Sequence, residues 1–272
     1  MEGARIEQVI LRRADLRLPF TTDFAERLEG QTVQAVNRRA KYLVVELSSG
    51  DRLVMHLGMS GWFNVLHGTR GRTDTVRGAA VATPDDREPG VFDKHDHVIF
   101  EMSTGALVVF NDPRRFGFMK ILTPAELAAD PALSVLGPEP LARSFSAAGL
   151  AQSLARRKTS LKVALLDQAT VAGLGNIYAC EALHVAKLSP KRRASSVATS
   201  TAQPRPEAVA LAEAIRVVLK DAIANRHRAG GEDRFRVYDH EGERCPRRTC
   251  GGTIRRIVQG GRSTFYCPLC QR

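Results

Sequence analysis

The chain has 272 residues, of which 40 are lysine or arginine and 29 are aspartate or glutamate, so its formal net charge at pH 7 is +11. This charge favours an anionic partner, usually nucleic acid, over the alternative of a basic enzyme with no such partner. Hydrophobic residues make up 43% of the chain, enough for one large or two modest cores, and no apolar run approaches the ~18 residues of a membrane span. With no apolar segment near the start, we expect a cytoplasmic protein with no membrane association, whose thiols stay reduced.

The first half of the chain is predicted to be β-structure. Apolar residues in alternation or in short runs, with turns at Ser49-Gly50 and Thr104-Gly105, predict strands over residues 5–11, 32–38, 42–47, 52–56, 98–102 and 106–110. Strands so closely spaced favour an antiparallel sandwich or barrel. Residues 67–93 lack periodicity and are rich in Gly, Arg, Asp, Thr and Pro, so we expect a long mobile surface loop there.

The pattern becomes helical after Ile121. In TPAEL, Thr123 is predicted as the N-cap, Pro124 as the first helical residue and Glu126 as the residue that closes a capping box. The segment LGPEPL, residues 136–141, is predicted to be the domain boundary. Beyond it, helical spacing of apolar residues predicts helices over residues 146–157, 161–168, 177–186 and 206–226.

Four of the five cysteines lie in the last 28 residues, at Cys245, Cys250, Cys267 and Cys270. They could form two disulfides or bind one metal ion. Each close pair can hold one side of a tetrahedral ion, and the β-rich segment between the pairs, with Gly260-Gly261 at its turn, predicts a hairpin. In a reducing compartment this pattern favours a zinc ribbon. Cys180, alone in an apolar stretch, is predicted to be a buried structural thiol rather than a reactive one.

Three segments of the first half offer candidate DNA contacts. NDPRRFGF presents Arg114 and Phe116 in a tight turn, where the cation can take a phosphate or a base edge and the ring can fill a vacated stack. The alternative is a β-turn with Phe116 in the core. In HLGMSGW, Met59 is either a second apolar wedge or a core methionine. In RRAKYL, Lys41 starts a strand and is either a functional cation or a solvated edge lysine.

The second half offers a candidate phosphate site in AGLGNIYACEAL, where two glycines and Asn176 precede a helix. Free N–H groups and the positive end of the helix dipole can bind a phosphate there, although an ordinary glycine turn with an Asn cap gives the same pattern. Basic residues cluster nearby in the sequence: Arg156, Arg157, Lys158 and Lys162 before this helix, and Arg247, Arg248, Arg255, Arg256 and Arg262 in the cysteine-rich segment.

Taken together, seven segments resemble the bacterial formamidopyrimidine-DNA glycosylases of the Fpg/Nei family. They are RRAKYL, HLGMSG, KHDHV, NDPRRFG, LGPEPL, GLGNIYACEAL and GRSTFYCPLCQR, and they occur in the family's order along nearly the whole chain. The resemblance implies an α+β fold: an N-terminal antiparallel β-sandwich over residues 1–135, a helix–two-turn–helix domain over 142–240 and a zinc finger over 241–272. It also implies base-excision repair, with removal of oxidised purines from duplex DNA followed by strand cleavage.

The resemblance assigns roles to particular residues. Those matching Met59, Arg114 and Phe116 fill the space that a flipped base leaves. Those matching Asn176 and Arg262 hold phosphates around the lesion, and the match to Lys41 contacts phosphate near the reacting nucleotide. His56 and Lys162 are included as DNA-binding residues. One structural zinc ion is expected on the four clustered cysteines, and the partner is duplex DNA with damaged or abasic sites, bound by a monomer in the nucleoid.

Two departures from the family bear on catalysis. Family members begin with PELPEVE, whose proline amine attacks the sugar and whose glutamate handles protons, whereas this chain begins MEGARIEQV. We therefore assign no catalytic nucleophile, give Lys41 an accessory role, and expect no Schiff base from a chain that starts at Met1. The loop after Gly230-Gly231 is also shorter than in family members that act on 8-oxoguanine.

Three functions follow from the sequence. The first is a glycosylase and AP lyase whose recorded start is an internal methionine. The second is a non-catalytic relative that binds damaged or abasic DNA. The third is a zinc-ribbon protein that binds RNA or the ribosome, which the ordered wedge segments in the first half disfavour.

Overall fold

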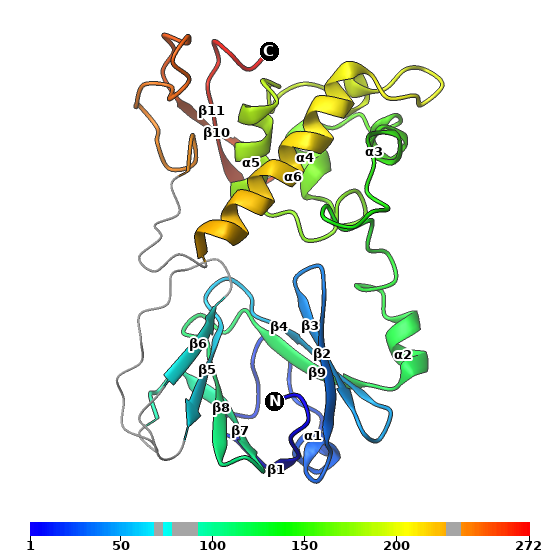
Figure 1. The fold of residues 1–272 in the computed structure, drawn as a ribbon, viewed down its shortest axis with the longest axis vertical. Coiled ribbons are helices and arrows are strands. Elements are labelled where there is room, and N and C mark those ends of the chain that lie inside the picture. The colour runs from blue at the N-terminus through cyan, green and yellow to red at the C-terminus, as the bar shows by residue number, and fades with distance from the viewer. Residues whose placement is uncertain (68–72, 78–91, 227–234) are drawn as a thin grey trace. The chain divides into compact units, whose positions relative to one another are not determined.

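The computed structural model describes residues 1–67, 73–77, 92–226 and 235–272, and it divides the chain into two compact units, Met1–Ser134 and Val135–Arg272 (Figure 1). The division lies between Ser134 and Val135, one residue before the segment LGPEPL. Each unit has its own hydrophobic core.

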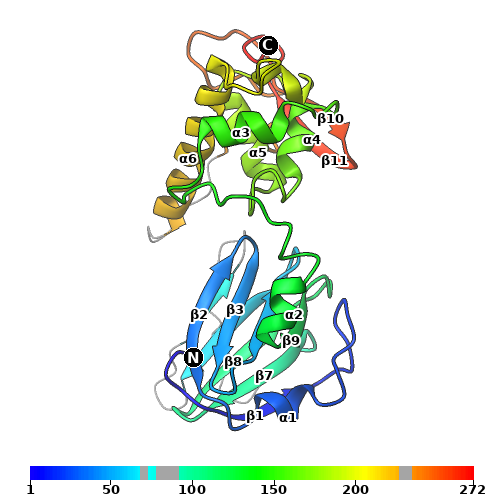
Figure 2. The same ribbon diagram turned by 90° about the vertical axis from the view of Figure 1, so that its right-hand side faces the viewer.

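The first unit is a sandwich of two antiparallel sheets, as the sequence predicts (Figure 2). One sheet has the order β1-β7-β8-β5-β6, formed by Ile6–Leu11, Asp96–Met102, Ala106–Asn111, Trp62–His67 and Thr73–Arg77. The other has the order β2-β3-β4-β9, formed by Val33–Arg39, Tyr42–Leu47, Arg52–His56 and Phe118–Leu122. Both sheets contribute to one buried cluster, which includes Phe100 and Phe110 from the first and Leu53 and Met119 from the second.

Two short helices belong to this unit. Helix α1, Phe24–Leu28, buries Phe24 and Leu28 in the core of the sandwich. Helix α2, Pro124–Ala129, begins with the predicted capping box, because the Thr123 hydroxyl accepts the Glu126 N–H and the Glu126 carboxylate accepts the Thr123 N–H. This cap satisfies two N–H groups that a helix start otherwise leaves unbonded.

The second unit is helical and ends in a two-stranded hairpin. Its elements are α3 Ala147–Leu154, α4 Leu161–Leu166, α5 Asn176–Val185, the 3-10 helix η1 Ala194–Val197, α6 Pro206–Arg226, β10 Arg255–Gln259 and β11 Arg262–Tyr266. Leu154, Leu165, Leu183 and Ile215 are among the residues that build its helical core. Around the hairpin, a smaller cluster joins Cys180 of α5 to Phe265 and the cysteine pairs. The sandwich, the helical region and the hairpin together give the α+β class expected from the sequence.

The expectation of a continuous loop over residues 67–93 was wrong in part. Thr73–Arg77 form β6, an edge strand that pairs antiparallel with β5, with Phe63 opposite Val76. A polar edge strand takes its conformation from backbone pairing with a distant segment, so its own sequence shows little periodicity. Residues 68–72 and 78–91, and the loop at Gly230-Gly231, lie outside the described residues.

Candidate nucleic-acid interface and metal centre

Two loops of the first unit meet and expose apolar side chains. Met59, in the loop after β4, is 67% exposed, and Phe116, in the turn after β8, is 42% exposed. The Arg114 guanidinium lies over the Phe116 ring, with its central carbon 4.7 Å from the ring centroid. The loops are in backbone contact, because a Cβ built on Gly58 would lie 2.5 Å from the carbonyl carbon of Phe116.

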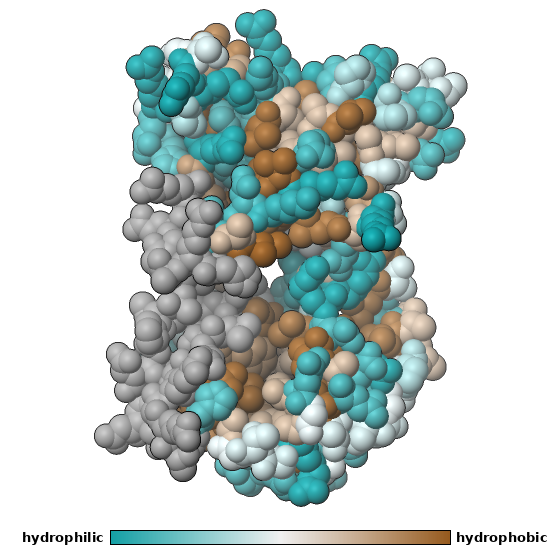
Figure 3. All heavy atoms as spheres, viewed as in Figure 1, coloured by the Kyte–Doolittle hydropathy of each residue, from teal (hydrophilic) through white to brown (hydrophobic). Residues whose placement is uncertain are grey.

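Neither apolar residue therefore belongs to the core, which removes the alternative interpretation of both segments. Figure 3 shows that apolar side chains reach the surface of the first unit, and Met59 and Phe116 are among the most exposed large ones. The structure thus brings Met59, Arg114 and Phe116 together at the surface.

A buried carboxylate fixes these two loops to each other. Asp112 accepts the Ser60 hydroxyl at 2.6 Å through Oδ1 and the Gly117 N–H at 2.8 Å through Oδ2. The Ser60 hydroxyl oxygen in turn accepts the Arg114 N–H at 3.3 Å. Charge-assisted hydrogen bonds of this kind are stronger than neutral ones, so Asp112 and Ser60 hold the exposed side chains on a defined scaffold. The sequence did not single out these two residues, because nothing local shows that Asp112 is buried.

His56 ends β4 beside the same loops. Its ring stacks on Phe118, with centroids 5.6 Å apart, and its Nδ1 accepts the Gly58 N–H at 2.9 Å. Burial, together with the positive charges of Lys41 and Arg17, lowers the pKa of His56. The neutral ring therefore carries its hydrogen on Nε2, which is available to donate to a ligand.

Lys41 is exposed in the turn between β2 and β3. It was expected at the start of a strand, and it lies one residue before the first residue of β3. The preceding residue, Ala40, has a φ of 54°. The charge of Lys41 lowers the pKa of His56, so the two side chains lie within electrostatic reach. The structure thus groups a solvent-accessible ammonium with a histidine donor on one part of this unit.

In the second unit, Asn176 and the β10–β11 hairpin come together. Asn176 is the first residue of α5, and its side-chain amide donates to the Ser263 carbonyl at 2.9 Å, across 87 positions of sequence. Its Oδ1 has no hydrogen-bond partner among the described residues. Arg262, exposed at the start of β11, directly precedes Ser263. The predicted pair Asn176 and Arg262 is therefore close in space, at a helix start that lacks a side-chain cap.

Lys162 of α4 differs from the other candidate cations because its side chain is 0% exposed. Its ammonium has no hydrogen-bond partner among the described residues. Burial lowers its pKa, the Arg262 charge lowers it further, and Cys180 opposes both. Lys162 thus lies within electrostatic reach of Arg262, beneath the surface rather than on it.

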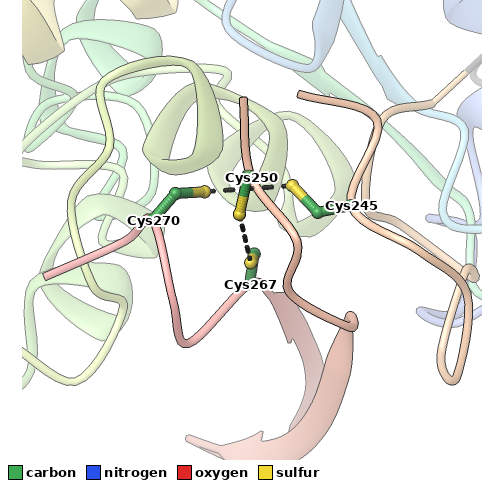
Figure 4. A group of neighbouring side chains, drawn as sticks. All are labelled: Cys245, Cys250, Cys267 and Cys270. Carbon is green, nitrogen blue, oxygen red and sulfur yellow. Dashed lines mark hydrogen bonds between the residues drawn. The ribbon is translucent and has the colours of Figure 1, made fainter. Parts of the chain in front are cut away.

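The four clustered cysteines meet at one point, as Figure 4 shows. Their sulfur atoms all lie within 4.8 Å of one another, with Cys245 and Cys270 at 3.9 Å and Cys250 and Cys267 at 3.6 Å. A disulfide would need about 2 Å, whereas four thiolates around a tetrahedral zinc ion at ~2.3 Å are separated by ~3.8 Å.

The electrostatics of this cluster also fit a cation. Burial, and then the neighbouring Cys267 and Cys245, raise the pKa of the Cys270 thiol to about 12. Four thiolates cannot share this site unless a positive ion compensates their charge. One structural zinc ion fits the donor set, and the disulfide alternative does not. Cys180 is buried, and burial raises the pKa of its thiol, which agrees with a structural role.

Helix α5 also holds the segment that leads to the hairpin, through residues that were not among the predicted site residues. The buried carboxylate of Glu181 accepts the N–H groups of Arg236, Val237 and Tyr238 at 2.8, 2.9 and 3.0 Å. One turn further along α5, His184 contacts the sulfur of Cys245. A carboxylate and an imidazole in an apolar helix carry no local signal of these distant partners.

None of the helices in the described ranges is long and apolar enough to cross a lipid bilayer.

Three family models match the chain in succession. They are the formamidopyrimidine-DNA glycosylase N-terminal domain over residues 1–119, the formamidopyrimidine-DNA glycosylase H2TH domain over 136–231 and the zinc finger found in FPG and IleRS over 242–272. The formamidopyrimidine-DNA glycosylase of Rhodopseudomonas palustris strain HaA2 is 54% identical, over 100% of this chain and 94% of the relative. That of Bradyrhizobium sp. strain BTAi1 is 51% identical with the same coverage.

Solved structures agree with these matches. Lactococcus lactis formamidopyrimidine-DNA glycosylase, non-covalently bound to DNA with an AP site, has a TM-score of 0.82 and 26% identity, over 100% of this chain and 94% of that one. MutM in complex with DNA that contains carbocyclic 8-oxo-G has a TM-score of 0.81 and 27% identity, with the same coverage. The resemblance of the seven sequence segments is confirmed by all three kinds of comparison, and the chain belongs to the formamidopyrimidine-DNA glycosylase family.

Proposed function

We propose that this protein is a base-excision repair enzyme that removes oxidised purines, 8-oxoguanine and formamidopyrimidines, from duplex DNA and cleaves the strand at the resulting abasic site. The observation that carries the proposal is the exposed group Met59, Arg114 and Phe116, held on the buried Asp112 scaffold. Relatives that match the whole chain are DNA glycosylases, and related structures hold DNA with an abasic site or carbocyclic 8-oxo-G.

The exposed group suits an enzyme that acts on an extrahelical base. Opening a base step costs a few kcal/mol, and an apolar wedge offsets this by filling the gap. Phe116 supplies an aromatic face, for which stacking on a base contributes about 1–3 kcal/mol. Met59 supplies a flexible apolar chain beside it, and Arg114 adds a cation for the phosphate or for the orphaned base.

The cations away from this group suit the phosphate backbone. We assign phosphate contacts to Arg262 and to the Asn176 side chain in the second unit, and to Lys41 and the His56 Nε2–H in the first. Lys41 also has an accessory role near the reacting nucleotide. We place Lys162, which is buried within electrostatic reach of Arg262, at the same phosphate site. Contacts of this kind fix the position of the duplex and carry no base information.

We further propose that residues 1–135, 142–240 and 241–272 work as sandwich, helix–two-turn–helix and zinc-finger domains of a monomer, acting on the bacterial nucleoid in the cytoplasm. The family matches and the two units support these bounds. The alternative of a non-catalytic binder has less support, because relatives 54% identical over the whole chain are glycosylases. The RNA-binding alternative gains no support from the two relatives named above, which are formamidopyrimidine-DNA glycosylases.

Binding to a duplex with a tetrahydrofuran abasic analogue, against the intact duplex, tests the interface. Arg262→Ala and Asn176→Ala should weaken binding to both duplexes similarly, and Arg262→Ala should lower the slope of log K against log salt by about 1. Met59→Ala and Phe116→Ala should instead lower the preference for the abasic duplex by about tenfold, as the loss of a stacking contact predicts.

Two variants serve as matched controls. Arg5→Ala removes an exposed arginine that pairs with Glu7, and Val209→Ala removes an exposed apolar side chain of α6, so both should leave binding unchanged. Release of 8-oxoguanine and strand cleavage, followed on a gel, test the chemistry. Unchanged affinity in both phosphate-site variants at moderate salt would overturn the interface assignment.

A further inference from the structure

His184 is the one imidazole that touches the cysteine cluster within the described parts of the chain. It lies in the last turn of α5, is 2% exposed, and places Nε2 at 3.4 Å from the Cys245 sulfur. The contact joins residues 61 positions apart, one in the helical core and one in the hairpin region. A second hydrogen bond connects His184 to the cysteine-rich segment, because the Arg247 guanidinium donates to the His184 carbonyl at 3.0 Å.

The chemistry of the sulfur fixes the direction of this hydrogen bond. A thiolate that ligates zinc can only accept, so the His184 Nε2 must carry the hydrogen. Four thiolates and one divalent ion leave a net charge of −2 in a buried site, and each N–H directed at a sulfur offsets part of that charge. Two of the four cysteines, Cys245 and Cys267, already accept backbone N–H groups from the turns in which they lie. His184 adds a side-chain donor from outside those turns.

The position of His184 on α5 means that its contact with Cys245 attaches this helix to the cysteine cluster. The first residue of α5, Asn176, donates to Ser263 of β11, and the last turn reaches Cys245. Glu181, between them, binds the N–H groups of residues 236–238. The helix is therefore attached to the hairpin and to the segment before it at three points along its length, and the last of these is a metal ligand.

We propose that His184 is a positioning residue for the zinc site: its Nε2–H bonds the Cys245 thiolate, slows loss of the metal, and ties the zinc site to the helix that carries Asn176. Outer hydrogen bonds to metal ligands typically change metal affinity by about 10–100-fold. Since the hydrogen bond acts through Cys245, its removal should accelerate release of zinc without removing a ligand.

The test compares His184→Gln with His184→Met in the purified, zinc-loaded full-length protein. The two replacement side chains are unbranched at Cβ and Cγ and similar in length, but only the Gln amide can donate to sulfur. Zinc release to an excess of a chromophoric chelator should be about tenfold faster in the Met variant and close to the original rate in the Gln variant. His240→Met, which changes a partly exposed histidine bonded to Glu243, is the control and should release zinc at the original rate.

A spectroscopic readout separates the hydrogen bond from packing. In protein reloaded with Co²⁺, the thiolate-to-metal charge-transfer band should move to lower energy in the Met variant and stay in place in the Gln variant, because an unbonded thiolate is the better electron donor. Equal zinc release by the Met variant and the original protein overturns the proposal, and so does equally fast release by both variants. Should the Met variant not fold, fast release from folded His184→Gln alone overturns it, and slow release supports it.

Discussion

The buried carboxylate of Asp130 shows how one residue can set the acid limit of the first unit. Burial by itself would raise the pKa of Asp130, but hydrogen bonds from the Lys120 ammonium and from the N–H groups of Ala132 and Leu133 outweigh it, and the pKa is lowered. A carboxyl whose pKa is lower in the folded chain stabilises the fold above its unfolded value, ~3.9. That stability is lost as the pH falls through the folded value.

We therefore expect Asp130→Asn to lower the free energy of unfolding by about 1–3 kcal/mol at pH 7, because Lys120 loses its charged partner and two N–H bonds weaken. The difference from the original protein should stay constant between pH 5 and 8 and shrink below about pH 4, where the carboxylate itself becomes protonated. Urea unfolding at several pH values measures this. If the difference in unfolding free energy shrinks near neutral pH, the lowered pKa of Asp130 is not its cause. Asp51→Asn, which breaks the more exposed pair with Arg27, is the comparison and should cost less stability.

Whether the role of a residue could be predicted depended on whether the residues next to it in the sequence indicate that role. Phe116 and Met59 were candidates because of the residue types in their own loops, and the structure exposes both. Lys162 was expected to be a DNA-binding residue, yet it is buried on α4, where packing by other elements decides its burial. Asp112 and His184 gave no signal at all, because the partners that define them, Ser60 and Cys245, lie 52 and 61 positions away.

At the level of elements, signals that reside in a few adjacent residues predicted structure well. The capping box of α2 is present as expected, and α6 spans the predicted residues 206–226. The cysteine spacing and Gly260-Gly261 predicted the β10–β11 hairpin, whose two glycines have φ of 55° and 70°. These signals work because a cap or a tight turn depends on the conformation of its own residues.

Elements whose existence depends on distant pairing were missed. Strand β5, between β8 and β6, has adjacent buried residues and so lacks the alternation of a half-exposed strand, while β6 forms at the edge by pairing with β5. Buried and partly exposed residues alternate along strand β9, with Met119 and Ile121 buried. This strand was not predicted because residues 111–117, directly before it, were interpreted as a functional turn. Sheet order and register are set by the whole sandwich rather than by one segment.

The two surface loops of the first unit form one element through Ser60, and this coupling can be tested. Ser60→Ala removes the hydroxyl that donates to Asp112 and accepts the Arg114 N–H. The loss of about 1 kcal/mol of loop–loop interaction should lower the preference for the abasic duplex about fivefold, with little change in affinity for intact DNA. Competition binding with the two duplexes measures the preference.

The control for this variant is Ser48→Ala, which removes a hydroxyl bonded to Gln31 just after the last residue of β3. It should leave the preference for the abasic duplex unchanged. Combining Ser60→Ala with Met59→Ala should give less than the sum of the two single effects, because both act on the same loop. Additive effects would show that the loops work independently.

At the scale of the whole molecule, each unit has buried hydrophobic clusters made of its own residues, within the part of the chain that the structure describes. Among the described residues, one cluster takes all its members from residues 4–121 and another from 145–218, and the cluster around the cysteines lies within 180–270. The sequence predicts the boundary at LGPEPL because glycine and proline interrupt regular structure there, and this stays a prediction. Separate cores predict separate unfolding events, since most of the cooperativity of a domain comes from its core.

We therefore expect calorimetry to resolve two transitions, of which zinc affects one. Metal analysis of the purified protein should find about one zinc per chain, and removal of that ion by a chelator should lower the melting temperature of the second unit alone, because its hairpin depends on the four cysteines. The reciprocal perturbation is Leu53→Ala in the sandwich core, which should cost about 2–5 kcal/mol and lower only the melting temperature of the first unit. If chelation and Leu53→Ala instead shift a single shared transition, the two units unfold cooperatively and the independence argued from their separate cores is wrong.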